Sequence, residues 1–341
     1  MKPFDFVQPR TVDEALAAWE PGAAWLGGGT NLVDLMKTGA VQPAKLIDIT
    51  RLPGLDTIET RADGSTRIGA LVSNADLADD PGFARSFPMV AEALLSGASG
   101  QLRNVATVAG NIMQSPRDAF FRELDPPSDP LSGGASLAVL GTGGRFAAVN
   151  PSDFAVPLVA LDAVVEVRGP GGAREIALAD LHLPPGDAPG NSTALRPGEL
   201  ILALRLPAAA AGFAAHSRYL KVRDRTSFAF ATSSAAASLQ IEGGRIAEAR
   251  LALGAVAPRP WRVAEAEALL AGRAIDAGLF AEVAEVALSG AVAVGGNGWK
   301  IELARRTAAR ALAMAAAGTP ARMPALPASP FAPQAGDLIH A

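Results

Sequence analysis

The residues best suited to binding chemistry are three consecutive glycines, Gly27 to Gly29, followed directly by Thr30 and Asn31. Because glycine has no β-carbon, such a run lets the backbone turn sharply and approach a ligand closely. Thr30 and Asn31 can cap a following helix, whose free N–H groups favour an anion. The pattern predicts either a diphosphate cradle or a plain turn from strand to helix. It fits neither the GxGxxG nor the GxxxxGK[ST] signature.

Residues that commonly bind metals or act as nucleophiles are scarce. The chain has no cysteine, which excludes disulfides, cysteine nucleophiles and thiolate-held metals or iron–sulfur clusters in this chain. The three histidines, His182, His216 and His340, form no close-spaced ligand pattern. The sequence therefore predicts neither a metal site nor a catalytic residue.

The composition is that of an ordinary globular protein. The chain has 341 residues, of which 49% are hydrophobic and 19% charged, enough for two or three domains. A net charge of −4 gives no reason to expect nucleic acid or an anionic membrane as partner. The N-terminus lacks an apolar signal region, and no apolar run of about 18 residues predicts a membrane span. The cytoplasm is the default compartment, with export to the periplasm on a partner's signal as the alternative.

The glycine run lies inside a predicted α/β unit. Strands are expected at residues 4–7, 23–26 and 45–49, and the helices between them contain residues 15–19 and 32–36. A capping-box pattern begins at Thr11, and Gly39 follows the second helix. The order β-α-β-α-β predicts a first subdomain of about residues 1–54.

The rest of the chain predicts a mixed second segment and a third segment of strands and helices. A polar, glycine-rich stretch at 96–111 is expected to contain a tight buried turn at 105–108. Strands are expected at 66–70, 136–140, 145–149, 163–168, 200–206 and 216–222, and a hairpin joins 228–241 to 246–256. Helices are expected at 88–95, 261–270, 277–288 and 299–316. Residues 319–341, rich in Pro and Ala, predict a mobile tail.

Six ordered stretches resemble one family. They are LGGGTNLVDLMK (26–37), GASGQLRNVATVAGNIMQ (97–114), and the segments at 151–167, 219–239, 258–262 and 300–312. Together they resemble the FAD-binding medium subunits of the molybdenum hydroxylase (xanthine dehydrogenase) family, and most of all those of aldehyde oxidoreductases. The first two stretches match the two FAD-diphosphate loops, and the resemblance extends to about residue 318.

The resemblance implies an α+β fold with two domains. Residues 1–209 would form an FAD-binding domain of the vanillyl-alcohol-oxidase/MurB (PCMH) type, whose two α/β subdomains, about 1–54 and 55–209, hold FAD between them. Residues 213–318 would form a C-terminal domain, similar to that of the CO dehydrogenase flavoprotein, with an antiparallel sheet and helices.

The resemblance also implies which residues bind FAD. They are Leu26, Gly27, Gly28, Gly29, Thr30, Asn31, Leu32, Thr107, Gly110, Asn111, Asp153, Ile201 and Lys221. Asp153 would accept from the ribitol or ribose hydroxyls, with Asp118 as the rival for that role. Lys221 would place a cation near the isoalloxazine. From the pattern alone, Asp153 could instead cap a helix, Lys221 could be a solvated strand lysine and Ile201 a core residue.

The function implied by the resemblance is that of an electron-transfer oxidoreductase subunit in a heterotrimer. A [2Fe–2S] small subunit would deliver electrons from a molybdenum-cofactor large subunit that oxidises an aldehyde or N-heterocycle. In the aldehyde oxidoreductase branch, the segment after the second loop often carries cysteines for a [4Fe–4S] cluster; none stands there in this chain, so FAD without a cluster is expected. Two alternatives stay open: a self-standing flavoenzyme using Arg223, Asp224 and Arg225, and a scaffold subunit without flavin.

Overall fold

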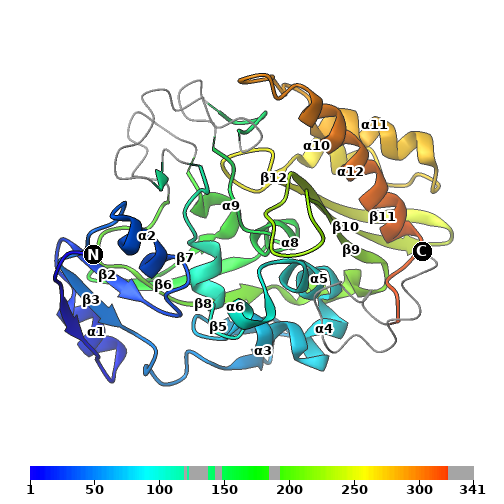
Figure 1. Cartoon of the computed structure of the whole chain (residues 1–341). Helices are drawn as coiled ribbons and strands as arrows, with labels where there is room; N and C mark the ends of the chain where they lie inside the picture. Colours follow the sequence, from blue (N-terminus) through cyan, green and yellow to red (C-terminus); the bar gives the residue numbers. More distant parts are fainter. Residues whose placement is uncertain (119–120, 123–136, 143–147, 184–192, 322–341) are drawn as a thin grey trace.

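Three sheets follow one another through the molecule (Figure 1). The computed structural model describes residues 1–118, 121–122, 137–142, 148–183 and 193–321. In the view of Figure 1 the N-terminal sheet lies at the left, a five-stranded sheet in the middle, and a four-stranded sheet with its helices at the right. This mixture of sheets and helices agrees with the predicted α+β class.

The N-terminal unit is a parallel sheet in the order β1-β3-β2. Its elements are β1 (Asp5–Val7), α1 (Val12–Ala18), β2 (Ala23–Leu26), α2 (Leu32–Thr38) and β3 (Lys45–Asp48). Thr11 caps α1 by accepting the Glu14 N–H, and Gly39 ends α2 at a φ of +83°. The predicted β-α-β-α-β order is therefore confirmed, and it places the glycine run between β2 and α2.

The middle sheet has the order β4-β5-β8-β6-β7, with all neighbours antiparallel. Its strands are β4 (Ile58–Thr60), β5 (Thr66–Gly69), β6 (Val164–Gly169), β7 (Gly172–Ala177) and β8 (Leu200–Leu206). The two edge strands, β4 and β7, were not predicted, since both are short and largely exposed and so lack a strong apolar alternation. Of the strands expected at 136–140 and 145–149, the described residues show only an isolated bridge between Leu137 and Ala148, and residues 136 and 145–147 lie outside the described part.

Short helices lie between the strands of the middle sheet along the chain. They are α3 (Asn74–Asp79), α4 (Pro81–Ser86), α5 (Pro88–Ser96), α6 (Gly100–Arg103), α7 (Val108–Ile112), α8 (Ala155–Ala160) and α9 (Leu178–Leu181). Polar side chains cap four of them at the N-terminus: Ser73, Asp80, Ser99 and Thr107. Frequent caps explain how such short helices hold their positions, because each cap satisfies a backbone N–H that the helix leaves unpaired.

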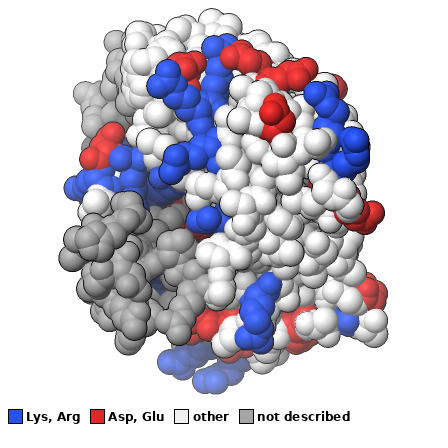
Figure 2. All heavy atoms as spheres, turned by 90° about the vertical axis from the view of Figure 1, so that its right-hand side faces the viewer, with Lys and Arg blue, Asp and Glu red and all other residues white. Residues whose placement is uncertain are grey.

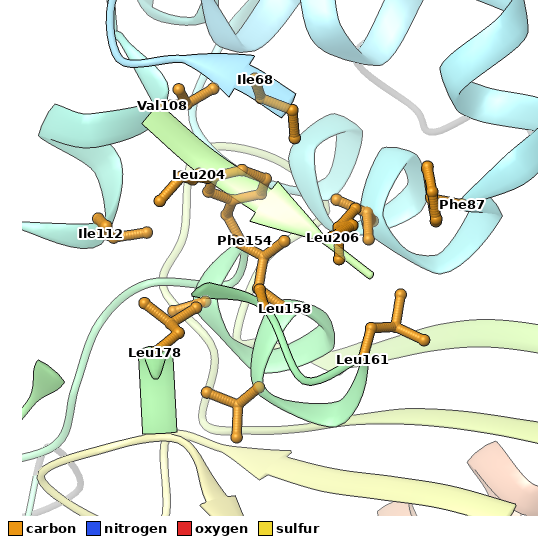
Figure 3. Close-up of a cluster of buried hydrophobic side chains, with 14 of the residues drawn as sticks. Ile68, Phe87, Val108, Ile112, Phe154, Leu158, Leu161, Leu178, Leu204 and Leu206 are labelled. Atoms are coloured by element: carbon orange, nitrogen blue, oxygen red, sulfur yellow. The ribbon is translucent and has the colours of Figure 1, made fainter. Parts of the chain in front are cut away.

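The main hydrophobic core joins the middle sheet to α7 and α8 (Figure 3). Phe154 and Leu158 lie beside Leu204 of β8, and Val108 and Ile112 of α7 belong to the same cluster. All five side chains are fully buried. Burying a side chain of this size stabilises a fold by about 2 kcal/mol. Phe154 directly follows Asp153, and Val108 and Ile112 lie in the second predicted loop, so the core fixes the backbone at both places.

The C-terminal sheet is antiparallel, in the order β12-β11-β10-β9. Its elements are η3 (Ala208–His216), β9 (Ser217–Val222), β10 (Ser233–Glu242), β11 (Arg245–Gly254), β12 (Trp261–Arg262), α10 (Ala264–Ala268), α11 (Ala277–Ala287) and α12 (Trp299–Ala316). Gly243 and Gly244, both at positive φ, make the two-residue turn of the predicted hairpin. The helices expected at 277–288 and 299–316 are confirmed within one residue.

Two predictions in this domain are wrong. The helix expected at 261–270 begins only at Ala264, because residues 261–262 pair with β11 as the strand β12. The hairpin strand expected from residue 228 begins at Ser233, because Phe228 adopts a φ of +48°, which a strand residue does not.

Lys300 predicts a measurable pH dependence of stability. It is fully buried on α12, donates to the Leu137 carbonyl at 3.1 Å, and burial lowers its pKa from the ordinary 10.5 to about 8. Between these values the unfolded chain keeps a proton that the folded chain has released, so the unfolding free energy rises with pH, by about 3 kcal/mol in all. We expect Lys300→Met to remove this rise in urea unfolding measured on both sides of the window. An identical pH profile in the variant would contradict the assignment.

Basic and acidic side chains interleave on the face shown in Figure 2, around an area with few charges. That face therefore has no broad patch of positive charge that would attract a polyanion. Among the described helices, none combines the length and apolar character that crossing a bilayer requires.

Candidate functional site

The first glycine loop packs directly against the second predicted loop. A β-carbon on Gly28 would lie 1.9 Å from the carbonyl oxygen of Val105, and one on Gly27 would lie 3.2 Å from Oγ1 of Thr107. Only glycine at position 28 lets the two backbones approach this closely. The glycine run therefore makes the turn from β2 to α2 and also packs on the second loop, and its role as a diphosphate cradle stays a prediction.

The second loop is fixed by its own side chains. Thr107 Oγ1 accepts the Gly110 N–H at 3.2 Å and so caps α7. The Asn111 side-chain oxygen accepts from Gln114 Nε2 at 2.9 Å and from Ser152 Oγ at 2.8 Å. The prediction of a tight buried turn here is wrong in one respect: Val105, at its tip, is 52% exposed.

A cavity of about 860 Å³ lies where the two loops, the segment around Asp153 and strand β9 meet. Six predicted residues line it: Thr30, Asn31, Gly110, Asn111, Asp153 and Lys221. The volume is within the range of about 300–1,000 Å³ that small-molecule and cofactor sites occupy. The structure therefore gathers groups from four distant parts of the sequence around one space large enough for a cofactor.

A buried ion pair forms one wall of the cavity. Lys221 Nζ donates to Asp153 Oδ2 at 2.7 Å and to the Ser96 carbonyl at 3.2 Å. The side chains of Lys221 and Asp153 are only 3% and 10% exposed. The solvated-lysine alternative for Lys221 is therefore wrong. The capping alternative for Asp153 is wrong too, because Ser152 Oγ accepts the N–H of Ala155 at the start of α8.

The other predicted residues do not line this cavity. Leu26 ends β2, Gly27 and Gly28 pack on residues 105–107, Gly29 faces Val33, and Leu32 begins α2. Thr107 caps α7. Ile201 is 6% exposed in β8 and packs in the core around Phe154, as its alternative expected. Contacts of these residues with a cofactor stay predictions. Asp118 lines the cavity together with Asp153.

Sequence reasoning missed several residues of the site. The Tyr219 hydroxyl donates to Asp153 Oδ1 at 2.6 Å, and its place two residues before Lys221 on a strand could have revealed it. The Arg117 guanidinium lies 4.7 Å from the ring centre of Phe230, and both line the cavity. Burial lowers the pKa of Arg117, yet an arginine keeps its charge. No local pattern joins two residues so far apart in sequence.

Two unpaired acceptors of the cavity fit a ligand that carries hydroxyl or amine groups, as a dinucleotide does. The side-chain oxygens of Asn31 and Asn74 are buried without a hydrogen-bond partner among the described residues, and both residues line the cavity. Buried acceptors are costly when unpaired, so this pair calls for hydroxyl or amine donors. In the described ranges, no group of three His, Asp or Glu side chains could hold a metal. The described histidines serve structural roles: His182 binds the Ile112 carbonyl, and His216 that of Ala315.

Comparison with known proteins identifies the families of both parts of the chain. Residues 2–209 match the family "FAD binding domain in molybdopterin dehydrogenase", and residues 218–319 match the "CO dehydrogenase flavoprotein C-terminal domain". The chain is 44% identical to the aldehyde oxidoreductase FAD-binding subunit PaoB of Escherichia coli K12, over 93% of this chain and 99% of that one. It is 28% identical to the carbon monoxide dehydrogenase medium chain of Afipia carboxidovorans OM5, over 80% and 81% of the two chains.

A solved structure shares the fold. It is the carbon monoxide dehydrogenase of Hydrogenophaga pseudoflava that lacks the Mo-pyranopterin moiety, with a TM-score of 0.75, 27% identity, and coverage of 93% of this chain and 98% of that chain. The predicted fold class and family resemblance are confirmed. The chain belongs to the FAD-binding subunits of the molybdopterin dehydrogenases, a family of oxidoreductases.

Proposed function

We propose that this chain is the FAD-binding electron-transfer subunit of a molybdenum hydroxylase that oxidises aldehydes or N-heterocycles. The observation that carries the proposal is the cavity of about 860 Å³ on which both predicted diphosphate loops and the Lys221–Asp153 pair converge. The 44% identity to an aldehyde oxidoreductase FAD-binding subunit supports aldehydes as the first substrates to test.

The proposed cofactor residues would bind different parts of FAD. Thr30, Asn31, Gly110 and Asn111 would offer hydroxyl, side-chain amide N–H and backbone N–H donors to the diphosphate, while the Asn31 side-chain oxygen would accept from a hydroxyl or amine elsewhere on the cofactor. Asp153 would accept from the sugar hydroxyls, and the Lys221 ammonium would stand near the isoalloxazine. Bound FAD supplies the capacity to take up electrons and to pass them to an outside acceptor. The protein's own task is to hold the ring, leave an edge within reach of the acceptor, and keep a fixed cation beside it.

The other residues predicted from the family do not line the cavity, and we propose that they support it. Gly27, Gly28, Gly29 and Thr107 would shape the cradle by letting the two loops meet. Leu26, Leu32 and Ile201 would provide apolar contacts. We also propose the domain limits 1–209 and 213–318, and the cytoplasm as the compartment of the protein.

The proposed partners are a [2Fe–2S] small subunit and a large subunit with the molybdenum cofactor. The relatives are named as subunits of larger enzymes, including a carbon monoxide dehydrogenase medium chain and a 6-hydroxypseudooxynicotine dehydrogenase complex subunit. This chain offers no cysteine to hold a cluster, so an iron–sulfur cluster that delivers single electrons to the flavin would lie on a partner.

The first test is an absorption spectrum of the purified chain together with metal analysis of the same sample. We expect a flavin spectrum, one FAD released per chain and no iron. A colourless chain that stays colourless after FAD is added would favour the scaffold alternative. Stoichiometric iron would contradict the cluster-free assignment, and turnover of an aldehyde by the isolated chain would favour a self-standing flavoenzyme.

A further inference from the structure

Tyr219 lies behind Asp153 as seen from the cavity. Successive side chains of a strand point to opposite faces, so Tyr219 and Lys221 of β9 share one face. Tyr219 does not line the cavity and is only 3% exposed, so its hydroxyl must find partners inside the protein. It donates to Asp153 Oδ1 at 2.6 Å, which makes it the second support of that carboxylate.

Both oxygens of Asp153 are thereby held. Oδ1 accepts from Tyr219 and Oδ2 from Lys221, at 2.6 and 2.7 Å. Ser234 stands opposite Lys221 on the neighbouring strand β10. The hydrogen bond to Asp153 fixes the direction of the Tyr219 O–H bond, because a hydroxyl has a single proton to donate.

The backbone of Tyr219 is anchored as firmly as its side chain. Its N–H donates to Glu92 Oε2 on α5 at 2.7 Å, and Arg218 holds the same carboxylate at 2.9 Å. The end of α5 contacts the same strand a second time, since the Ser96 carbonyl accepts from Lys221 at 3.2 Å. The aromatic side chain thus stands on a strand that is tied to α5 at two points.

We propose that Tyr219 is a positioning residue of the cofactor site, which sets Asp153 and, through it, the Lys221 ammonium at the cavity wall. The inference rests on the proposed function, because it assumes that the cavity holds FAD. Tyr219 touches no cavity space itself, so its effect reaches the cofactor only through Asp153 and Lys221. Because each oxygen of Asp153 already accepts a hydrogen bond, the carboxylate cannot rotate freely. The remaining lone pairs of its oxygens therefore point in fixed directions.

The chain offers a direct spectroscopic test, because Tyr219 is its only tyrosine. Burial, and next the charge of Asp153, raise the pKa of Tyr219 well above the ordinary 10.0. In the flavin-free chain we expect phenolate absorbance to appear at lower pH in Asp153→Asn than in the unaltered chain. Coincident titration curves would overturn the proposal, since the hydroxyl would then not sense the carboxylate.

The second test is a double-mutant cycle on FAD affinity, measured by flavin fluorescence on the full chain. We expect Tyr219→Phe to weaken FAD binding about tenfold, but by less than about twofold when Asp153 is already alanine. Ser238→Ala is the control, because it removes a fully buried hydroxyl from β10 without touching the cavity, and it should leave the affinity unchanged.

The outcomes separate the two hypotheses. Unchanged FAD affinity in Tyr219→Phe, or an equal loss with and without Asp153, overturns the positioning role. If the unaltered chain binds no FAD, the proposed function fails, and the tyrosine titration still decides whether Tyr219 holds Asp153.

Discussion

Gly28→Ala is expected to abolish FAD binding and to lower the unfolding free energy of the flavin-free chain by about 3 kcal/mol. The added methyl group would lie 1.9 Å from the Val105 carbonyl oxygen, 2.8 Å from its carbon and 3.2 Å from the Ala106 α-carbon. All three are backbone atoms, so no side chain can rotate away to relieve the overlap. The two loops must separate, and the cradle that they form together opens. Flavin titration and urea unfolding of the variant measure the two effects.

Gly100→Ala is the matched control for this prediction. Gly100 begins α6 near the same loop, and a β-carbon there meets no atom within 4 Å. We expect its unfolding free energy to change by no more than about 0.5 kcal/mol, with FAD affinity retained. If both variants bound FAD normally, close packing of the two loops would not be what shapes the site.

Elements bounded by strong local signals could be predicted from the sequence. The first helix starts at the Thr11 cap and the second ends at Gly39, and both limits depend on residues within one turn. The helix predicted at 261–270 begins too early because the local pattern does not decide between helix and strand at residues 261–262. Trp261 and Arg262 are strand residues because they pair with Leu253 and Ala252 across the sheet, and the apolar spacing within 261–270 does not reveal that pairing.

For the site, the identity of several residues could be predicted from the sequence, but the contacts between them could not. The residue types alone indicate the glycine run, family motifs indicate Asn111, Asp153 and Lys221, and six of the predicted residues line one cavity. Their mutual contacts were not predictable. The Lys221–Asp153 pair joins residues 68 positions apart, and the fit of Gly28 against Val105 depends on how two loops meet. Such contacts are set by tertiary packing of the core around Phe154, which sequence pattern constrains only loosely.

The Lys221–Asp153 pair carries the other large expected effect. Lys221→Met leaves a carboxylate buried at 10% exposure without its cation, and removing one partner of a buried pair costs about 3–5 kcal/mol. We expect a loss of this size in urea unfolding of the flavin-free chain, together with loss of FAD binding. Arg306→Met, which breaks an exposed pair with Glu302 on α12, should cost less than about 1 kcal/mol and leave FAD binding intact.

Combining Lys221→Met with Asp153→Asn separates stability from function. The double variant buries no unpaired charge, and the asparagine oxygen can still accept from Tyr219, so it should recover part of the stability that Lys221→Met loses. Its FAD binding should stay weak, because the cation and the carboxylate proposed to meet the cofactor are both gone. Additive losses of stability would mean that the two side chains do not act as a buried pair. Restored FAD binding would mean that neither charge is needed to hold the cofactor, and the diphosphate loops alone would then account for its affinity.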